Sequence, residues 1–143
     1  MLHIAKRPGE IDLQKLVELY DIKGEDAESF VDYIENRFFD IPGASYYIVE
    51  ESASYISALR VEPYLDGFLI SGLHTEKAHR RKGYATKLLR MVTDDLPGVV
   101  YSHILHKNIA SVRAHSNCGF VKMLDYAKLL DGTVSSRYIT MKK

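Results

Sequence analysis

One stretch of the sequence, residues 68–105, changes its hydrophobic period twice and restricts the folds that the chain can adopt. Phe68 to Leu73 is typical of a strand, Tyr84 to Val92 places its apolar residues on one helical stripe, and Val99 to Leu105 is again rich in β-formers. Pro97-Gly98 ends the helix before the second strand begins. A strand, a helix and a strand in this order form a crossover between parallel strands, with the helix covering one face of their sheet.

The remaining segments predict antiparallel strands and further helices around this crossover. Strands are expected at Leu2 to Lys6, Tyr46 to Val49, Tyr55 to Val61, Phe120 to Leu130 and Ser136 to Met141, and helices at Ile11 to Tyr20, Asp26 to Phe38 and Asn108 to Asn117. Asp66-Gly67 and Asp131-Gly132 are hairpin signals, while Asn108 is suited to cap a helix and Gly119 to end it. The sequence therefore predicts a mixed α/β fold with about seven strands and about four helices.

The composition indicates one domain over residues 1–143 and excludes several classes of protein. The chain has 46% hydrophobic residues, and its 19 basic side chains balance its 19 acidic ones. This balance argues against a nucleic-acid-binding protein held by bulk positive charge. No apolar run approaches the roughly 18 residues needed to cross a membrane. The lone Cys118 and an N-terminus without a signal-peptide core lead us to expect a cytoplasmic protein.

The balanced charge conceals an uneven distribution along the chain. Residues 1–66 carry 14 acidic and 6 basic side chains, whereas residues 67–143 carry 5 acidic and 13 basic ones. A solvated surface and a pair of oppositely charged ligands are both compatible with this asymmetry.

A basic loop stands at the predicted start of the crossover helix. Arg80, Arg81 and Lys82 oppose the helix dipole there, so their placement is unfavourable unless an anion binds, although a solvated first turn is the alternative. Gly83 and Ala85 keep side-chain bulk away and let backbone amides approach phosphate oxygens. The glycine patterns of nucleotide P-loops and dinucleotide-binding folds are absent, which argues against ATP and NAD.

Two motifs in this part of the chain resemble those of the GNAT superfamily of N-acetyltransferases. The first is Arg80-x-x-Gly83-x-Ala85, and the second is Asn108-x-x-Ser111-x-x-x-His115-x-x-x-Gly119-Phe120. The resemblance implies a single mixed, mostly antiparallel sheet that splays apart at its centre. Acetyl-CoA is expected in the gap between the strand that ends near Thr75 and the strand from Val99 to Leu105.

The resemblance also implies which residues contact acetyl-CoA. Backbone groups of two strand residues are expected on the pantetheine arm and near the reacting carbonyl, and amides of the basic loop on the pyrophosphate. The expected contact residues are Leu73, Thr75, Arg80, Arg81, Lys82, Gly83, Tyr84, Ala85, Thr86, Asn108, Ser111 and His115. Asn108 is a pantetheine contact or only a helix cap. His115, where relatives often have a Tyr, is either the general acid that protonates the leaving thiolate or a residue that packs against or contacts the cofactor.

The remaining candidates for chemistry stay unassigned at this stage. A base for the acceptor amine is expected near the splay, where Glu62, His74, Glu76, Ser102 and His103 lie on or beside the central strands. No metal site is expected, because His103 and His106 project to opposite faces of a strand. Cys118 lacks a partner base and is expected to pack, which favours direct transfer in a ternary complex. Tyr138 is within reach of the acceptor site.

We therefore expect an acetyl-CoA-dependent N-acetyltransferase that acetylates a primary amine of a small molecule or peptide. The alternative is a non-catalytic acyl-CoA-binding or regulatory module with the same fold. Because the two N-terminal helices are rich in Asp and Glu, a cationic acceptor is expected. Neither nucleic acid nor membrane is expected as a partner, and monomer and homodimer remain equally open.

Overall fold

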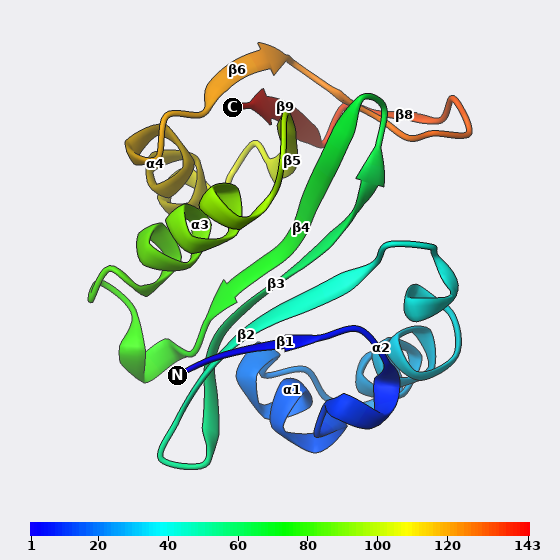
Figure 1. Cartoon of the computed structure of the whole chain (residues 1–143), viewed down its shortest axis with the longest axis vertical. Coiled ribbons are helices and arrows are strands. Elements are labelled where there is room, and N and C mark those ends of the chain that lie inside the picture. Colours follow the sequence, from blue (N-terminus) through cyan, green and yellow to red (C-terminus); the bar gives the residue numbers. More distant parts are fainter.

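A computed structural model describes residues 1–143 and contains one seven-stranded sheet, in the order β1-β2-β3-β4-β5-β9-β6 (Figure 1). All neighbouring strands are antiparallel except β4 and β5, which the crossover joins in parallel. The strands are β1 (Leu2–Ala5), β2 (Ser45–Glu51), β3 (Ser54–Tyr64), β4 (Gly67–Thr75), β5 (Val100–Leu105), β6 (Val121–Leu124) and β9 (Tyr138–Lys142). The predicted mixed and mostly antiparallel sheet is confirmed.

Two pairs of helices cover opposite faces of the sheet, as Figure 1 shows. They are α1 (Leu13–Tyr20) and α2 (Gly24–Asn36) on one face, and α3 (Tyr84–Asp95) and α4 (Ile109–Asn117) on the other. The core is divided accordingly, with Leu16, Leu19 and Ile34 in one apolar cluster and Leu88 and Leu89 in another. The four predicted helices are confirmed, and none of the helices is both long and apolar enough to span a bilayer.

The sheet opens between β4 and β5. Only three residue pairs join these strands, from Phe68 opposite Val100 to Ile70 opposite Ser102. Beyond Ile70, β4 continues to Thr75 beside β3, while β5 continues beside β9. The central splay that the resemblance to the GNAT superfamily implies is therefore present.

A β-bulge in β4 lies at the splay. Ser71 pairs with Arg60 and His74 pairs with Ala58, so Gly72 and Leu73 together stand opposite one residue of β3. Gly72 has a positive φ of 64°. A bulge turns peptide groups away from regular pairing, and here it does so where β5 no longer covers the strand.

The prediction of a single strand from Phe120 to Leu130 is wrong, because this segment is divided between the main sheet and a separate hairpin. After β6, the chain leaves the main sheet and forms a separate hairpin of β7 (Ala127–Lys128) and β8 (Val134–Ser135). The Thr140 hydroxyl donates to the Tyr126 carbonyl at 2.7 Å, and the Tyr64 hydroxyl donates to the Lys128 carbonyl. These bonds fasten the start of the hairpin to β9 and its strand β7 to the end of β3.

Gly67 differs from its predicted role in the hairpin between β3 and β4. The turn is formed by Leu65 and Asp66, with φ of 50° at Leu65, and Gly67 is already the first residue of β4. A Cβ atom on Gly67 would lie 2.0 Å from the Val99 carbonyl oxygen. That oxygen accepts a 3.0 Å hydrogen bond from the Phe68 amide at the start of the β4–β5 pairing. Gly67 therefore allows the two halves of the sheet to join closely.

We expect Gly67→Ala to lower the free energy of unfolding by about 2 to 3 kcal/mol, because the added methyl group must push the backbone of Val99 away. Gly9→Ala is the matched control, since no atom lies within 4 Å of a Cβ at Gly9 and its φ is not positive. Urea unfolding of both variants and the wild type measures the difference. Equal stability of the two variants would show that the close approach at Gly67 is unimportant.

Candidate active site

Two cavities meet at the splay. The first, which we call the loop cavity, has a volume of about 520 Å³ and lies between the end of β4, the loop before α3 and the first turn of α4. The second, the inner cavity, has a volume of about 540 Å³ and is lined by β3, β4, β5, α4 and the β7–β9 segment. Leu73, Asn108 and Ser111 line both. The two cavities are therefore neighbours at the gap in the sheet, one beside the start of α3 and the other beside β5 and the β7–β9 segment.

The loop cavity has the properties of an anion site. The backbone amides of residues 81–86 donate no hydrogen bond within the chain, and the first turn of α3 has no acidic side chain. Arg81 and Gly83 have positive φ values of 64° and 82° in the loop that leads into the helix. Free amides at a helix N-terminus, beside the cationic Arg81, can bind phosphate oxygens.

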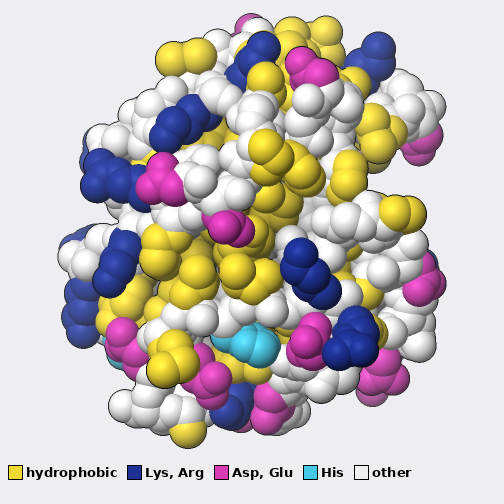
Figure 2. All heavy atoms as spheres, viewed as in Figure 1, with side chains coloured by type: hydrophobic (Ala, Val, Ile, Leu, Met, Phe, Trp, Pro, Cys, Tyr) yellow, Lys and Arg dark blue, Asp and Glu magenta, His cyan; other side chains and the backbone are white.

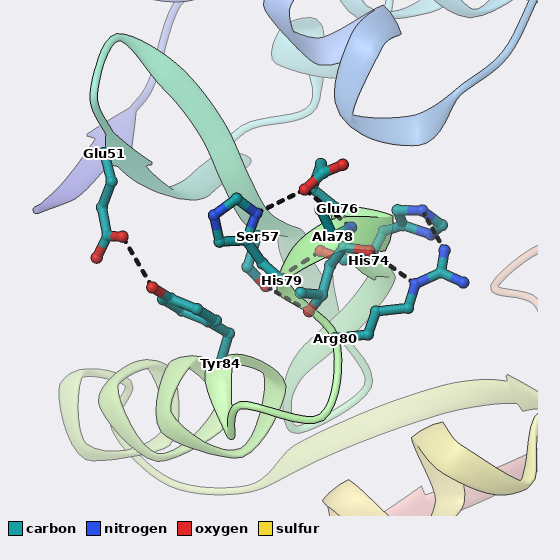
Figure 3. A network of polar contacts seen from close by, with 9 residues as sticks. Glu51, Ser57, His74, Glu76, Ala78, His79, Arg80 and Tyr84 are labelled. Atoms are coloured by element: carbon teal, nitrogen blue, oxygen red, sulfur yellow. Dashed lines mark hydrogen bonds and ion pairs between the residues drawn. The ribbon is translucent and has the colours of Figure 1, made fainter.

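The three basic residues of the loop have different positions. Arg81 is exposed and lines the loop cavity, whereas Lys82 lines neither cavity. The Arg80 Nε atom donates to the Thr75 carbonyl at 3.1 Å, and its Nη2 atom lies 3.2 Å from His74 Nε2 (Figure 3). Arg80 therefore fastens the loop to the end of β4. Figure 2 shows Lys and Arg side chains along the left edge of the molecule, the side on which Figure 1 places the start of α3.

A network of polar contacts fixes this strand-to-helix loop. The Glu76 carboxylate accepts from the Ala78 amide at 3.1 Å and contacts His79 Nδ1, and the bond to His79 lowers the Glu76 pKa (Figure 3). The Ser57 hydroxyl donates to the His74 carbonyl at 3.1 Å. Glu76 lines neither cavity, and His74 lines only the loop cavity. Neither of these two base candidates therefore lines the inner cavity.

Tyr84 and Thr75 direct polar groups away from the loop cavity. The Tyr84 hydroxyl donates to Glu51 at 2.8 Å, and the Thr75 hydroxyl bonds with Ser57 at 3.0 Å. Because the Thr75 carbonyl already accepts from Arg80, Leu73 has the more available backbone at the splay. Ala85 and Thr86 line the loop cavity beside Tyr84.

Three residues of the second motif lie on one face of α4, as their spacing predicts, and line the inner cavity. They are Asn108, Ser111 and His115. The Asn108 side chain accepts from the Ser111 amide at 3.1 Å and caps the helix. The His115 Nδ1 atom lies 2.7 Å from the Ser111 carbonyl oxygen, which is an acceptor only, so Nδ1 carries the proton. The cap predicted for Asn108 is confirmed, and it leaves Asn108 exposed at the junction of both cavities.

His115 is a buried neutral side chain. Only 1% of its surface is exposed, its ring packs edge-on against Phe120, and its Nε2 atom is buried without a hydrogen-bond partner. Burial lowers its pKa to about 4, against a smaller opposite effect of the bond to Ser111. Near neutral pH the ring therefore has no second proton to donate.

The inner cavity contains several of the unassigned polar candidates. Glu62, Ser102, His103 and Tyr138 all line it. Burial raises the pKa of Glu62, an effect that the charge of Arg60 partly offsets, and burial lowers the pKa of His103. Both pKa shifts favour the uncharged form of the side chain.

Two further residues fall outside the cavities. The His106 Nε2 atom lies 2.9 Å from the Asp125 carbonyl oxygen, and no group of three His, Cys, Asp or Glu side chains is arranged to hold a metal ion. Cys118 is buried, its Sγ atom lies 3.3 Å from the Thr86 carbonyl oxygen, and burial raises its pKa. It is a packed thiol, as expected.

Arg60 is the lining residue that sequence reasoning missed. It stands in the middle of β3, and apolar residues occupy both faces of this part of the strand. A strand that is apolar on both faces is covered on both faces, so a cation within it has to be buried. That pattern in residues 55–61 was the available signal.

Comparisons with known proteins agree with this geometry. The sequence model of the acetyltransferase (GNAT) family matches residues 13–120. No curated protein matches the chain as a whole at a significant level.

Solved structures with the same fold include three acetyltransferases. The ribosomal-protein-S18-alanine N-acetyltransferase from Escherichia coli has a TM-score of 0.67 and 14% identity, covering 99% of this chain and 92% of that one. A GNAT acetyltransferase from Bacillus cereus has a TM-score of 0.69 and 20% identity, and the match covers 100% of this chain and 96% of that one. The PaiA N-acetyltransferase from Thermoplasma acidophilum, in complex with coenzyme A, has a TM-score of 0.70 and 12% identity, and the match covers 100% of this chain and 98% of that one.

The family match extends over most of the chain and includes the whole of the crossover, the basic loop and α4. The splayed sheet and the free amides at the start of α3 are where the resemblance of the two sequence motifs implies them. The chain therefore belongs to the acetyltransferase (GNAT) family and is an N-acetyltransferase.

Proposed function

We propose that the domain formed by residues 1–143 transfers an acetyl group from acetyl-CoA to a primary amine by direct attack in a ternary complex. The observation that carries this proposal is that the loop cavity, beside the free amides of residues 81–86, shares lining residues with the inner cavity where β4 and β5 separate. An extended cofactor with phosphates at one end and a reactive group at the other fits two neighbouring cavities of this kind. The acceptor then approaches from the inner cavity.

The residues at the loop cavity fit the pyrophosphate of CoA. The amides of residues 81–86 and the Arg81 side chain would hold its oxygens, and Arg80 would keep the loop in place through Thr75. Leu73, at the bulge, would offer a backbone amide to the negative charge that develops on the carbonyl oxygen. Acetyl-CoA itself supplies the thioester carbonyl that the amine attacks, with CoA as the leaving group.

The role of His115 as a general acid stays a prediction, and its surroundings favour contact with the cofactor instead. Its Nδ1 proton is bonded to Ser111, and its Nε2 atom is buried. Glu62 and His103 are the groups in the inner cavity that would accept the proton of the amine, directly or through water. The high pKa of the buried Cys118 supports transfer without an acyl-cysteine intermediate.

The charge of the N-terminal helices supports a cationic amine only through long-range attraction. None of their acidic side chains lines either cavity. Of the three solved structures described above, only that from Escherichia coli is named for its acceptor, and at 14% identity it shows the fold alone, so the acceptor has to be inferred from the inner cavity of this chain.

The experiment that tests the proposal measures release of CoA from acetyl-CoA across a broad panel of amines. We expect release that depends on the amine and saturates with both substrates, together with a sequential kinetic pattern, because both bind before transfer. Tight binding of acetyl-CoA without amine-dependent release would instead favour the non-catalytic module.

We expect Arg81→Gln to weaken CoA binding about tenfold, because it removes a charged donor beside the free amides. Lys82→Gln is the matched control: it removes the same charge one residue away, from a side chain that lines neither cavity. Calorimetric titration with CoA at low and high salt measures both effects. Equal affinities of the two variants would contradict the assignment of Arg81.

We expect the His115 ring to titrate near pH 4 in an NMR titration of the wild type. The unfolded chain binds a second proton on the His115 ring more tightly than the folded chain does. Above about pH 6.5 the ring is neutral in both states and its contribution to the free energy of unfolding is complete, and this contribution is lost as the pH falls toward 4. The loss amounts to about 3 kcal/mol. Urea unfolding at pH 7 and pH 4.5 measures it in the wild type, and a His115→Gln variant should lack it. If the His115 ring titrated near pH 6.5 instead, it could serve as the general acid.

A further inference from the structure

Arg60 is a half-buried cation inside an aromatic cage. Its guanidinium carbon lies 5.9 to 6.0 Å from the ring centroids of four side chains, which are Phe30, Tyr33, Phe38 and Tyr46. These rings come from α2, from the turn after it and from β2. Aromatic faces attract a cation but provide no negative charge to neutralise it.

The chain does not pair Arg60 with an anion. No carboxylate oxygen lies within 4.0 Å of its guanidinium, although shorter ion pairs occur elsewhere in the molecule, such as Lys15 with Glu50 at 2.8 Å. An arginine keeps its charge at every physiological pH. Moving a charge partly out of water without a paired anion has a cost, so a residue of this kind points to a ligand that completes it.

The guanidinium is held at the bulge of β4. A Cβ atom on Gly72 would lie 3.0 Å from three of its atoms, so only glycine gives it this space without displacement. The Tyr20 hydroxyl donates to the Gly72 carbonyl at 2.6 Å and fastens α1 to the same bulge. Arg60 is therefore next to Leu73, where the acetyl group is expected.

The charges that line the inner cavity are one cation and one carboxylate. They are Arg60 and Glu62, which lie on the same face of β3 because they are two residues apart. Burial raises the pKa of Glu62, and Arg60 is close enough to offset part of this rise, but the two side chains do not form an ion pair. A molecule with both an amine and an anionic group complements this arrangement.

We propose that the acceptor is a small amino acid or a related aminocarboxylate, whose carboxylate binds Arg60 while its amine is acetylated. This inference rests on the proposed acetyltransferase function and names its acceptor class. A planar carboxylate matches the two parallel donors of a guanidinium. A phosphate fits less well, because its second negative charge would have no other cation in the cavity and would face Glu62.

The test measures binding rather than turnover. Wild-type protein saturated with CoA is titrated calorimetrically with glycine, L-methionine, L-phenylalanine and 4-aminobutanoate, and with the amide of each. The amide keeps the amine and lacks the carboxylate. We expect at least one acid to bind ten times more tightly than its amide, or more. O-phosphoethanolamine is titrated in parallel.

Variants then assign the preference to one residue. Arg60→Met fills the cage without a charge, and Arg60→Lys keeps the charge but loses the paired donors. We expect the preference for the acid to disappear in the first and to fall in the second. Arg37→Met is the matched control, since Arg37 also lies over Tyr33, at 5.6 Å, but does not line the inner cavity. It should keep the preference of the wild type.

The outcomes separate this inference from the function on which it rests. If no acid binds more tightly than its amide, if the preference survives in both Arg60 variants, or if O-phosphoethanolamine binds best, the inference is wrong. CoA release with amides at the rate of the acids would overturn it as well, and would leave the acetyltransferase intact. Preferred binding of acids without any CoA release would contradict the acetyltransferase and retain Arg60 as the carboxylate site.

Discussion

The separation of β4 from β5 after three paired residues is the constraint on which the rest of the site depends. At one end Gly67 lets the strands join closely at Val99, and beyond Ile70 no partner covers β4 on that side. The bulge at Gly72 and Leu73 lies at this opening, and α3 and α4 begin beside it. One gap therefore brings the free amides of the loop, the cap of α4 and the inner cavity together. A sheet with regular pairing would have none of these contacts.

Electrostatics gives the two sides of the gap different ligand preferences. On one side, unpartnered amides and Arg81 favour phosphate oxygens, and Arg80 is used to hold the loop. On the other side, the half-buried Arg60 lies among aromatic rings with Glu62 nearby. The net charge of zero hides this arrangement, because the many acidic residues of α1 and α2 lie outside both cavities. Binding depends on the few charged side chains that line the cavities, and the net charge of the whole chain does not reveal them.

The order of elements, the crossover and the basic loop could be predicted from the sequence because each rests on local periodicity or spacing. The cap at Asn108 and the packing of Cys118 follow for the same reason. What could not be predicted depends on contacts between distant segments. The close approach of the Val99 carbonyl requires Gly67, bonds from Tyr64 and Thr140 hold the β7–β8 hairpin in place, and Arg80 bonds to the Thr75 carbonyl. Arg60 was missed because its cage is built from α2 and β2, whose packing on β3 is not encoded in any short motif.

The measurement that tests the central claim most directly is hydrogen exchange at the amides of residues 81–86, with and without CoA. These amides have no acceptor within the chain, so they should exchange rapidly in the free protein and at least about tenfold more slowly when phosphate oxygens accept their hydrogen bonds. The β7–β8 hairpin, which lies away from the loop cavity, should not change. Slowed exchange confined to residues 81–86 and the residues of the gap is the predicted result. Unchanged exchange at residues 81–86 with saturating CoA would contradict the account.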